Sequence, residues 1–136
     1  MKQDAIVSGI LARNHEVMLA KRASSKKIAP GMYHLPGGHI EFGEEPEAAL
    51  IREFKEEFDL DISAQRVVRA FSYMKDDLHT VGITYEVRCG TIPETIRFDT
   101  HDTEEIAWVS RDNYEAYVGG NPSDHDLITL RRYFAS

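Results

Sequence analysis

The sequence of 136 residues contains a single cysteine, Cys89, and it has no long apolar run. One cysteine excludes an intramolecular disulfide framework and a zinc site built from several cysteines, and it is typical of a reducing compartment. No stretch approaches the ~18–20 apolar residues needed to span a bilayer, and the N-terminus lacks the apolar segment of a signal peptide. We therefore expect a cytoplasmic protein with no membrane partner.

Positive charge is also in short supply, because 16 lysines and arginines face 23 aspartates and glutamates, for a net charge of −7. Such a surface repels a phosphate backbone, so a nucleic-acid polymer is not an expected partner. Small phosphorylated molecules remain open as ligands if divalent cations offset the repulsion. The composition, 42% hydrophobic and 29% charged, is that of a globular protein, and the length predicts one domain over residues 1–136.

The order of the expected strands and helices along the chain predicts an α/β or α+β layered fold. Strands are expected at 5–12, 17–21, 33–35, 67–74, 81–89 and 106–109, and helices at Pro46–Phe58 and 124–134. Asn14 and His15 should form the turn of a hairpin, and the Pro-Gly-Gly at 36–38 should end the third strand sharply. Ser123 is the expected cap of the C-terminal helix.

Three glutamates in the helix expected at Pro46–Phe58 are spaced to share one side of it. At ~100° per residue, Glu53, Glu56 and Glu57 fall on one arc, with Ala49 among them leaving room for a ligand. The apolar side chains expected to face the core occupy the adjoining arc: Leu50, Ile51, Phe54 and Phe58.

Glu53 and Glu57 are i,i+4 neighbours, and like charges at that spacing destabilise a helix. Arg52 and Lys55 are expected to project from the far side, so a divalent cation is the more economical counter-charge. Carboxylate oxygens suit magnesium or manganese. The alternative is an ordinary solvated face, as most carboxylate runs are. The Pro-Gly-Gly segment at 36–38, whose glycine backbone can approach a metal closely, favours the metal site.

This stretch resembles the signature of the Nudix family, the Nudix box. Gly38 is followed after five residues by Glu44 and after seven more by REFKEE at 52–57. One fixed position differs, because Asp59 stands where the family has glycine, and the expected apolar Leu60 follows. Aspartate tolerates the left-handed conformation that often ends a helix, so we expect the departure to affect local stability slightly. The lead-in LPGGHIEFGE at 35–44 is similar to MutT-like members.

The resemblance implies an α/β/α sandwich around a mixed central sheet, with the catalytic helix on it and a C-terminal helix. It implies that Mg²⁺, with Mn²⁺ as an alternative, is held by Glu53, Glu56, Glu57 and the Gly38 carbonyl. One of these carboxylates would act as general base, and we favour Glu53. Arg52 would orient a catalytic glutamate, and Glu44 would support the site from just before the helix.

Four further residues, away from the fixed positions of the box, carry expectations of contact with metal or substrate. Glu104 or its neighbour Glu105 resembles a loop acid that contributes a metal ligand or the base in related enzymes; the alternative is an ordinary exposed acid. Arg22 occupies a position where family members often contact phosphate; the alternative is a solvated arginine at a strand end. His39 is placed to contact substrate; the alternative is an ordinary surface histidine. Homodimers are common in the family, so self-association is also allowed.

The activity implied by the resemblance is hydrolysis of a nucleoside diphosphate linked to a further group. A nucleoside triphosphate, natural or oxidised or otherwise modified, is the leading substrate, giving the monophosphate and pyrophosphate. ADP-ribose, a nucleotide sugar or a dinucleotide is the alternative within the same chemistry. A sensor that binds a nucleotide without hydrolysing it is the alternative of another class, and retention of all three helix glutamates argues against it.

Overall fold

The computed structural model describes residues 1–26, 31–118 and 124–136. Its elements in chain order are β1 (Lys2–Arg13), β2 (Glu16–Arg22), β3 (Tyr33–His34), β4 (Gly37–His39), α1 (Pro46–Phe58), β5 (Ile62–Lys75), β6 (Leu78–Cys89), β7 (Thr103–Val109), α2 (Tyr114–Val118) and α3 (His125–Ala135). Among the described residues, no helix is both long and apolar enough to cross a membrane.

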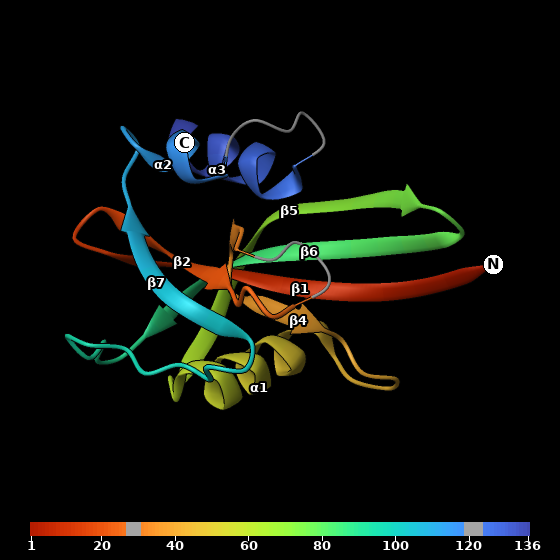
Figure 1. The fold of residues 1–136 in the computed structure, drawn as a ribbon, viewed down its shortest axis with the longest axis horizontal. Coiled ribbons are helices and arrows are strands. Elements are labelled where there is room, and N and C mark those ends of the chain that lie inside the picture. The colour runs from red at the N-terminus through yellow and green to blue at the C-terminus, as the bar shows by residue number, and fades with distance from the viewer. Residues whose placement is uncertain (27–30, 119–123) are drawn as a thin grey trace.

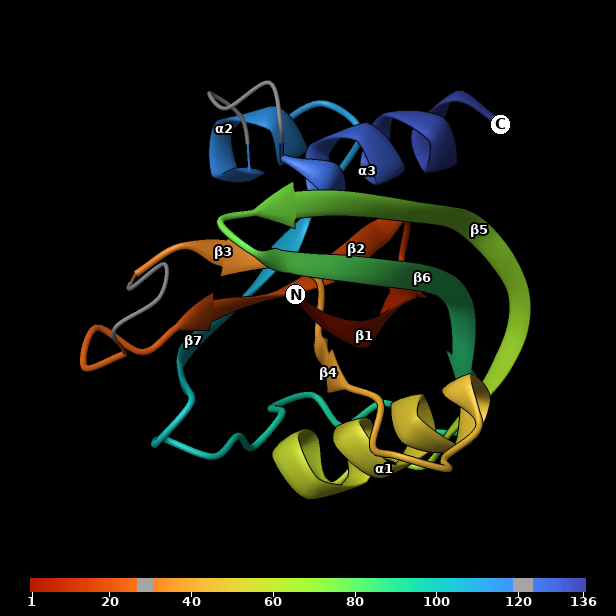
Figure 2. The same cartoon turned by 90° about the vertical axis from the view of Figure 1, so that its right-hand side faces the viewer.

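The strands form one mixed sheet with β1 at its centre, in the order β3-β2-β1-β6-β5, while β4 pairs with β1 and β7 with β2. The β1–β6 pair is parallel, and the other pairs are antiparallel. Helix α1 lies on one face of the sheet and α2 and α3 lie on the other (Figures 1 and 2). The predicted α/β/α sandwich with its mixed central sheet is therefore confirmed.

Two hydrophobic clusters hold the layers together, one on each face of the sheet. Val7 of β1 and Met18 of β2 belong to the cluster under α1, whereas Ile10 and Leu19 of the same strands belong to the cluster under α3. This division follows from the period of two along a strand, which sends successive side chains to opposite faces. The central strands are apolar on both faces because both faces are covered.

The structure differs from the sequence prediction at several element boundaries. Gly37 and Gly38 do not simply end a strand, because they form β4 and pair with Ser8 and Val7 of β1. Strand β5 begins at Ile62, five residues earlier than expected, and α2 was not predicted. The side chain of Asp124 caps α3 by accepting from two backbone amides; Ser123, the expected cap, lies outside the described residues.

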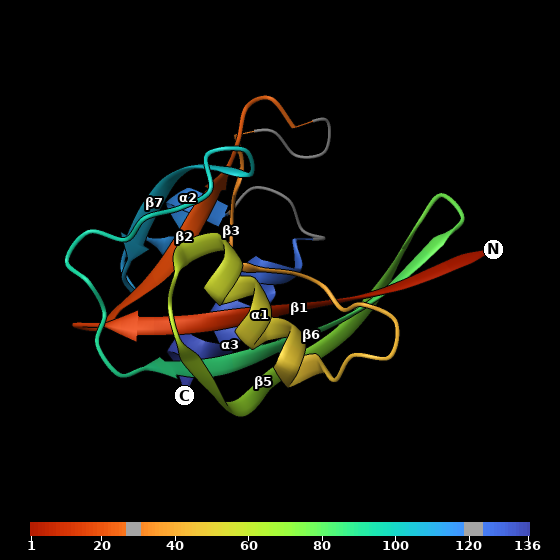
Figure 3. The same ribbon diagram turned by 90° about the horizontal axis from the view of Figure 1, so that it is seen from below.

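The buried side of α1 is rotated toward the acids relative to the prediction. Ala49 is completely buried in the core, so it does not leave room for a ligand, and Ile51 is 42% exposed although it was expected in the core. Three of the expected core residues of α1, Leu50, Phe54 and Phe58, are buried as predicted. Seen from below, α1 lies over the sheet with β1 running behind it (Figure 3). This rotation places Glu53 and Glu57 at the edge of the buried surface.

Asp59 ends α1 in the left-handed conformation, with φ 54° and ψ 38°, as expected for the residue that replaces the family glycine. Its amide donates to the Lys55 carbonyl, and the Leu60 amide donates to the Phe54 carbonyl. The Lys55 ammonium lies 2.9 Å from the Asp59 carboxylate and holds the pKa of that carboxyl below its usual value. Lys55 thus offsets the unfavourable charge of Asp59 at the helix C-terminus.

Candidate active site

Strand β4 brings the backbone of Gly38 directly against the carboxylate of Glu53. A Cβ atom placed on Gly38 would lie 2.5 Å from the Glu53 Cδ, closer than real Cβ contacts occur. On the other side, a Cβ on Gly37 would collide with the Val7 carbonyl of β1. Both glycines are therefore required by space, Gly37 for strand pairing and Gly38 for the position of Glu53.

Arg52 links the acids of this region instead of projecting away from them. Its Nε and Nη2 donate to the two carboxylate oxygens of Glu44 at 2.9 and 3.0 Å, and its Nη1 donates to Glu53 Oε1 at 3.1 Å. Nη2 also donates to the His39 carbonyl, and Nη1 lies 3.4 Å from Glu56 Oε2. The expectation that Arg52 lies on the far side of the helix was wrong, because its long side chain reaches back to the preceding loop.

The Arg52–Glu44 pair sets the charge state of the loop in front of α1. The guanidinium of Arg52 lowers the pKa of Glu44 to about 2, helped by the Glu41 amide, which donates to the same carboxylate. The paired carboxylates in turn raise the pKa of Arg52. Two parallel N–H···O bonds fix the guanidinium in one orientation. Glu44 is therefore linked to Glu53 through Arg52, and its supporting role stays a prediction.

Glu53 and Glu57 are both half-buried, and burial raises the pKa of each carboxyl. For Glu53 the contact with Arg52 opposes this shift, and for Glu57 the opposing contact is the Thr103 hydroxyl, which donates to Oε1 at 2.7 Å. Glu56 differs from them, because its side chain is 64% exposed. The three glutamates share one side of the helix but occupy different environments.

Glu57 meets two aspartates from the loop that leads into β7. One carboxylate oxygen from each of Glu57, Asp99 and Asp102 lies within 4.8 Å of the others, and this is the one such group among the residues described. The Asp99 amide donates to the Glu57 carbonyl at 3.1 Å, which ties the loop to the end of α1. Three carboxylates at this separation are a donor set that suits a hard divalent cation, so the residues present fit such an ion.

Asp99 and Asp102 were missed as site residues. The sequence shows only an acidic run from Asp99 to Glu105, and nothing in its spacing separates a ligand from a solvated acid. Asp102 also lies 2.5 Å from the Lys26 ammonium. This ion pair lowers the pKa of Asp102, while the neighbouring charges of Asp99 and Asp102 help to raise that of Glu57.

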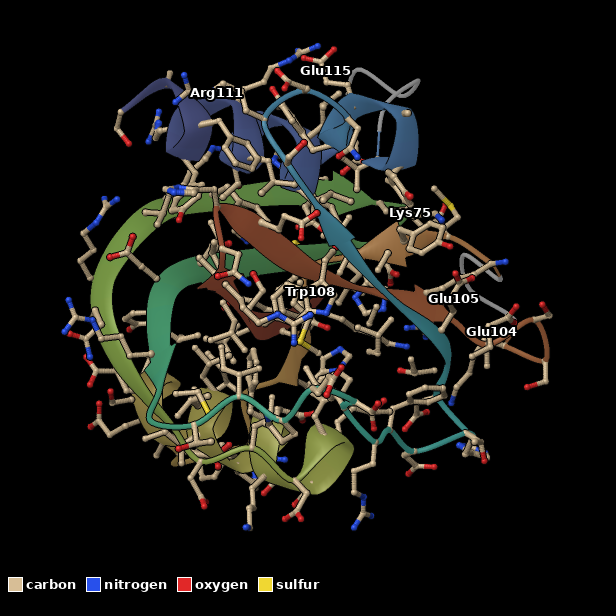
Figure 4. All side chains as sticks on the ribbon, turned by 90° about the vertical axis from the view of Figure 1, so that its left-hand side faces the viewer. Lys75, Glu104, Glu105, Trp108, Arg111 and Glu115 are labelled. Carbon is tan, nitrogen blue, oxygen red and sulfur yellow. The ribbon has the colours of Figure 1, made fainter. Side chains whose placement is uncertain are left out.

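Glu104 and Glu105 lie on β7 (Figure 4). Neither belongs to this acidic group. Glu104 accepts from the amide and the hydroxyl of Ser24, each at 2.6 Å, and its other oxygen is 3.4 Å from the Lys21 ammonium. Glu105 accepts from the Tyr33 hydroxyl at 2.9 Å, and together with burial it raises the pKa of Tyr33 to about 12. Both acids therefore contact residues of β2, β3 and the loop after β2.

The two expected substrate contacts lie on different strands. His39 is exposed at the end of β4, and its Nε2 is 3.1 Å from the Asp4 carboxylate. Arg22 ends β2, where the register of the β2–β7 pair shifts, and its amide donates to the Met32 carbonyl. Contact of either side chain with a substrate stays a prediction.

Comparison with known proteins places this geometry in context. The NUDIX domain family model matches residues 1–130. Nucleoside triphosphatase NudI of Enterobacter sp. (strain 638) is 31% identical over 122 residues, covering 83% of this chain and 86% of that protein. The 8-oxo-dGTP diphosphatase of Escherichia coli (strain K12) is 34% identical over 80 residues, 58% of this chain and 61% of that one. The crystal structure of the MutT protein from Methanosarcina mazei Go1 superposes with a TM-score of 0.81 at 16% identity, covering 97% and 94% of the two chains.

Proposed function

The chain belongs to the Nudix hydrolase family, and we propose on that basis that it cleaves a nucleoside triphosphate, natural or with a modified base, to the monophosphate and pyrophosphate. The similarity to proteins named nucleoside triphosphatase and 8-oxo-dGTP diphosphatase supports this substrate class. The single observation that carries the proposal is the pair of half-buried carboxylates of α1, Glu53 and Glu57, each held in place by a donor from a neighbouring residue.

A divalent cation belongs in this proposal because of the oxygen ligands beside Glu57. We assign Mg²⁺, with Mn²⁺ as the alternative, to Glu57, Asp99 and Asp102. The family resemblance implies Glu53, Glu56 and the Gly38 carbonyl as further ligands. When bound, the cation supplies charge that offsets the triphosphate and lowers the pKa of a water molecule. The net charge of −7 disfavours an anionic substrate, and a bound cation would offset this repulsion beside the α1 carboxylates.

The residues around Glu53 fit the role of holding a general base in one position. Arg52 donates to Oε1 of Glu53, and Glu44 fixes Arg52 through two hydrogen bonds. The carboxylate lies against the backbone of Gly38, which limits its movement on that side. We therefore propose that Glu53 accepts the proton of the attacking water, with Arg52 and Glu44 as positioning residues.

An assay of pyrophosphate release from a nucleotide panel in the presence of Mg²⁺ tests the proposal. We expect Glu53→Gln and Glu57→Gln each to lower turnover by at least ~10²-fold, as the loss of a base or a metal ligand does. Glu47→Gln is the matched control, because Glu47 is an exposed acid in the first turn of the same helix.

The products and the variants separate the alternatives. Release of a sugar phosphate, or turnover of dinucleotides alone, would replace the triphosphate with another linked diphosphate as substrate. Nucleotide binding without turnover would identify a sensor and refute the enzymatic proposal. Near-normal activity of both glutamine variants would remove the roles assigned to the α1 carboxylates.

A further inference from the structure

A cavity lies on the face of the sheet opposite to α1. It is open, has a volume of about 630 Å³, and is lined mainly by His15, Arg66, Glu86, Arg111, Tyr133 and Phe134. Tyr133 and Phe134, in the last turns of α3, pack against the hydrophobic cluster between the sheet and α2–α3. The carboxylates of the active site project from α1, which packs on the other cluster. Figure 4 shows Arg111 beside α3, on the far side of the molecule from α1.

The charged lining of this cavity favours an anion. Arg66 makes one ion pair with Glu86 at an N···O distance of 3.5 Å, which leaves most of its five N–H donors for another acceptor. Within residues 1–26, 31–118 and 124–136, no hydrogen bond or ion pair of the Arg111 side chain is seen. Ser136 also lines the cavity. Among the side chains of this lining, two guanidinium groups face one carboxylate, that of Glu86, in a chain that is otherwise strongly acidic.

The lining of the cavity also includes two aromatic side chains, Tyr133 and Phe134. The rings of Tyr133 and Phe134 meet edge to face, with centroids 5.2 Å apart and planes at 73°. Both side chains are only partly buried, so part of each ring stays accessible. His15, which also lines the cavity, lies in the turn between β1 and β2, where Asn14 and His15 have φ values of 52° and 65°. Two successive positive φ values define a tight hairpin turn, which fixes the position of His15.

We propose that this cavity binds an organic phosphate in which a phosphate monoester is joined to a planar ring, such as a nucleoside monophosphate. Arginine forks bind phosphate oxygens in pairs, which assigns the phosphate to Arg66 and Arg111. The ring then packs against Tyr133 and Phe134. The volume lies within the ~300–1,000 Å³ typical of small-molecule sites. This site is separate from the catalytic carboxylates, so it binds its ligand without the divalent cation.

Titration of the ¹⁵N-labelled protein with nucleoside monophosphates in EDTA tests the proposal. We expect chemical-shift changes at Arg66, Arg111 and the end of α3, and a loss of affinity of about tenfold or more in Arg111→Ala, as expected when a charge-assisted hydrogen bond is removed. Arg132→Ala is the matched control, because Arg132 is an exposed arginine of α3 outside the cavity lining, and it should bind like the wild type.

Parallel titrations with the nucleoside alone and with inorganic phosphate separate the two halves of the site. Each should bind more weakly than the monophosphate. The proposal is overturned if the chemical-shift changes are confined to α1 and β4, or if Arg111→Ala binds the monophosphate as tightly as Arg132→Ala does. It is also overturned if inorganic phosphate binds as tightly as the monophosphate. A thermal melt of Arg111→Ala that matches the wild type shows that its loss of binding is not a loss of folding.

Discussion

Replacing Gly38 with alanine would move the Glu53 carboxylate while leaving both its charge and its hydrogen-bonding groups in place. The new Cβ would sit 2.5 Å from the Glu53 Cδ, whereas ordinary contact begins at 3.4 Å, so the carboxylate must retreat by about 1 Å. The atoms that must move are the far end of a flexible side chain, and Gly38 has no positive φ. We therefore expect a folded protein whose melting temperature changes little.

The expected kinetic effect of Gly38→Ala is large, because a displacement of about 1 Å at a catalytic group can cost ~10²-fold in rate. Steady-state kcat for a nucleoside triphosphate, measured with excess Mg²⁺, is the assay. Gly90→Ala is the control, because a Cβ at Gly90 would meet no atom within 4 Å. A folded Gly38→Ala variant with wild-type kcat would refute the argument that the position of Glu53 against this backbone governs turnover.

Three further predictions concern stability, pH and metal. Thr103→Val removes the 2.7 Å hydrogen bond to Glu57, so urea titration should show a loss of about 1 kcal/mol in unfolding free energy; no loss would mean that water replaces the hydroxyl. Burial raises the pKa of Asp126, whose carboxylate accepts from the Leu35 amide, to about 6 from 3.8. The Asp126 carboxyl then holds its proton more tightly in the native state than in the unfolded chain. The stabilisation that this protonated carboxyl contributes is complete below pH ~4 and is lost as the pH rises through ~6. Thermal melts at a series of pH values should show that the melting temperature of Asp126→Asn changes less over that range than that of the wild type. An unchanged pH dependence would contradict the raised pKa of Asp126. Chelation should abolish hydrolysis, and Asp99→Asn should raise the Mg²⁺ concentration for half-maximal activity by about tenfold; an unchanged requirement would exclude Asp99 as a ligand.

Local features of α1 follow from the sequence because they depend on neighbours in the chain. Pro46 at the start and Asp59 at the left-handed end bound the helix as predicted. The 3.6-residue repeat correctly places Glu53 and Glu57 beside the core residues of α1. The same repeat does not determine how the helix is turned on the sheet. Burial of Ala49 and exposure of Ile51 therefore differ from the prediction, because packing against β1 and β5 decides the rotation.

The contacts of long side chains and loops could not be predicted in the same way, because their partners lie on other segments of the chain. The spacing of Arg52 on the helix suggests a position away from the acids, but Glu44 draws its guanidinium back over Glu53. Similarly, Glu104 resembles the loop acid of related enzymes, and Ser24 and Lys21 hold its carboxylate outside the group of Glu57 and the two aspartates. Its role as a metal ligand or base stays a prediction.

The sequence by itself determined the family of this protein, because the glycine pair at 37–38 and three glutamates at helical spacing are features of short segments of the chain. Only the tertiary structure decided which other acids join them. Asp99 and Asp102 reach Glu57 because the loop before β7 is hydrogen-bonded to the end of α1, across more than forty residues of chain. The physical reason is that backbone propensity acts over a few residues, whereas the meeting of distant side chains depends on how the layers of the sandwich pack.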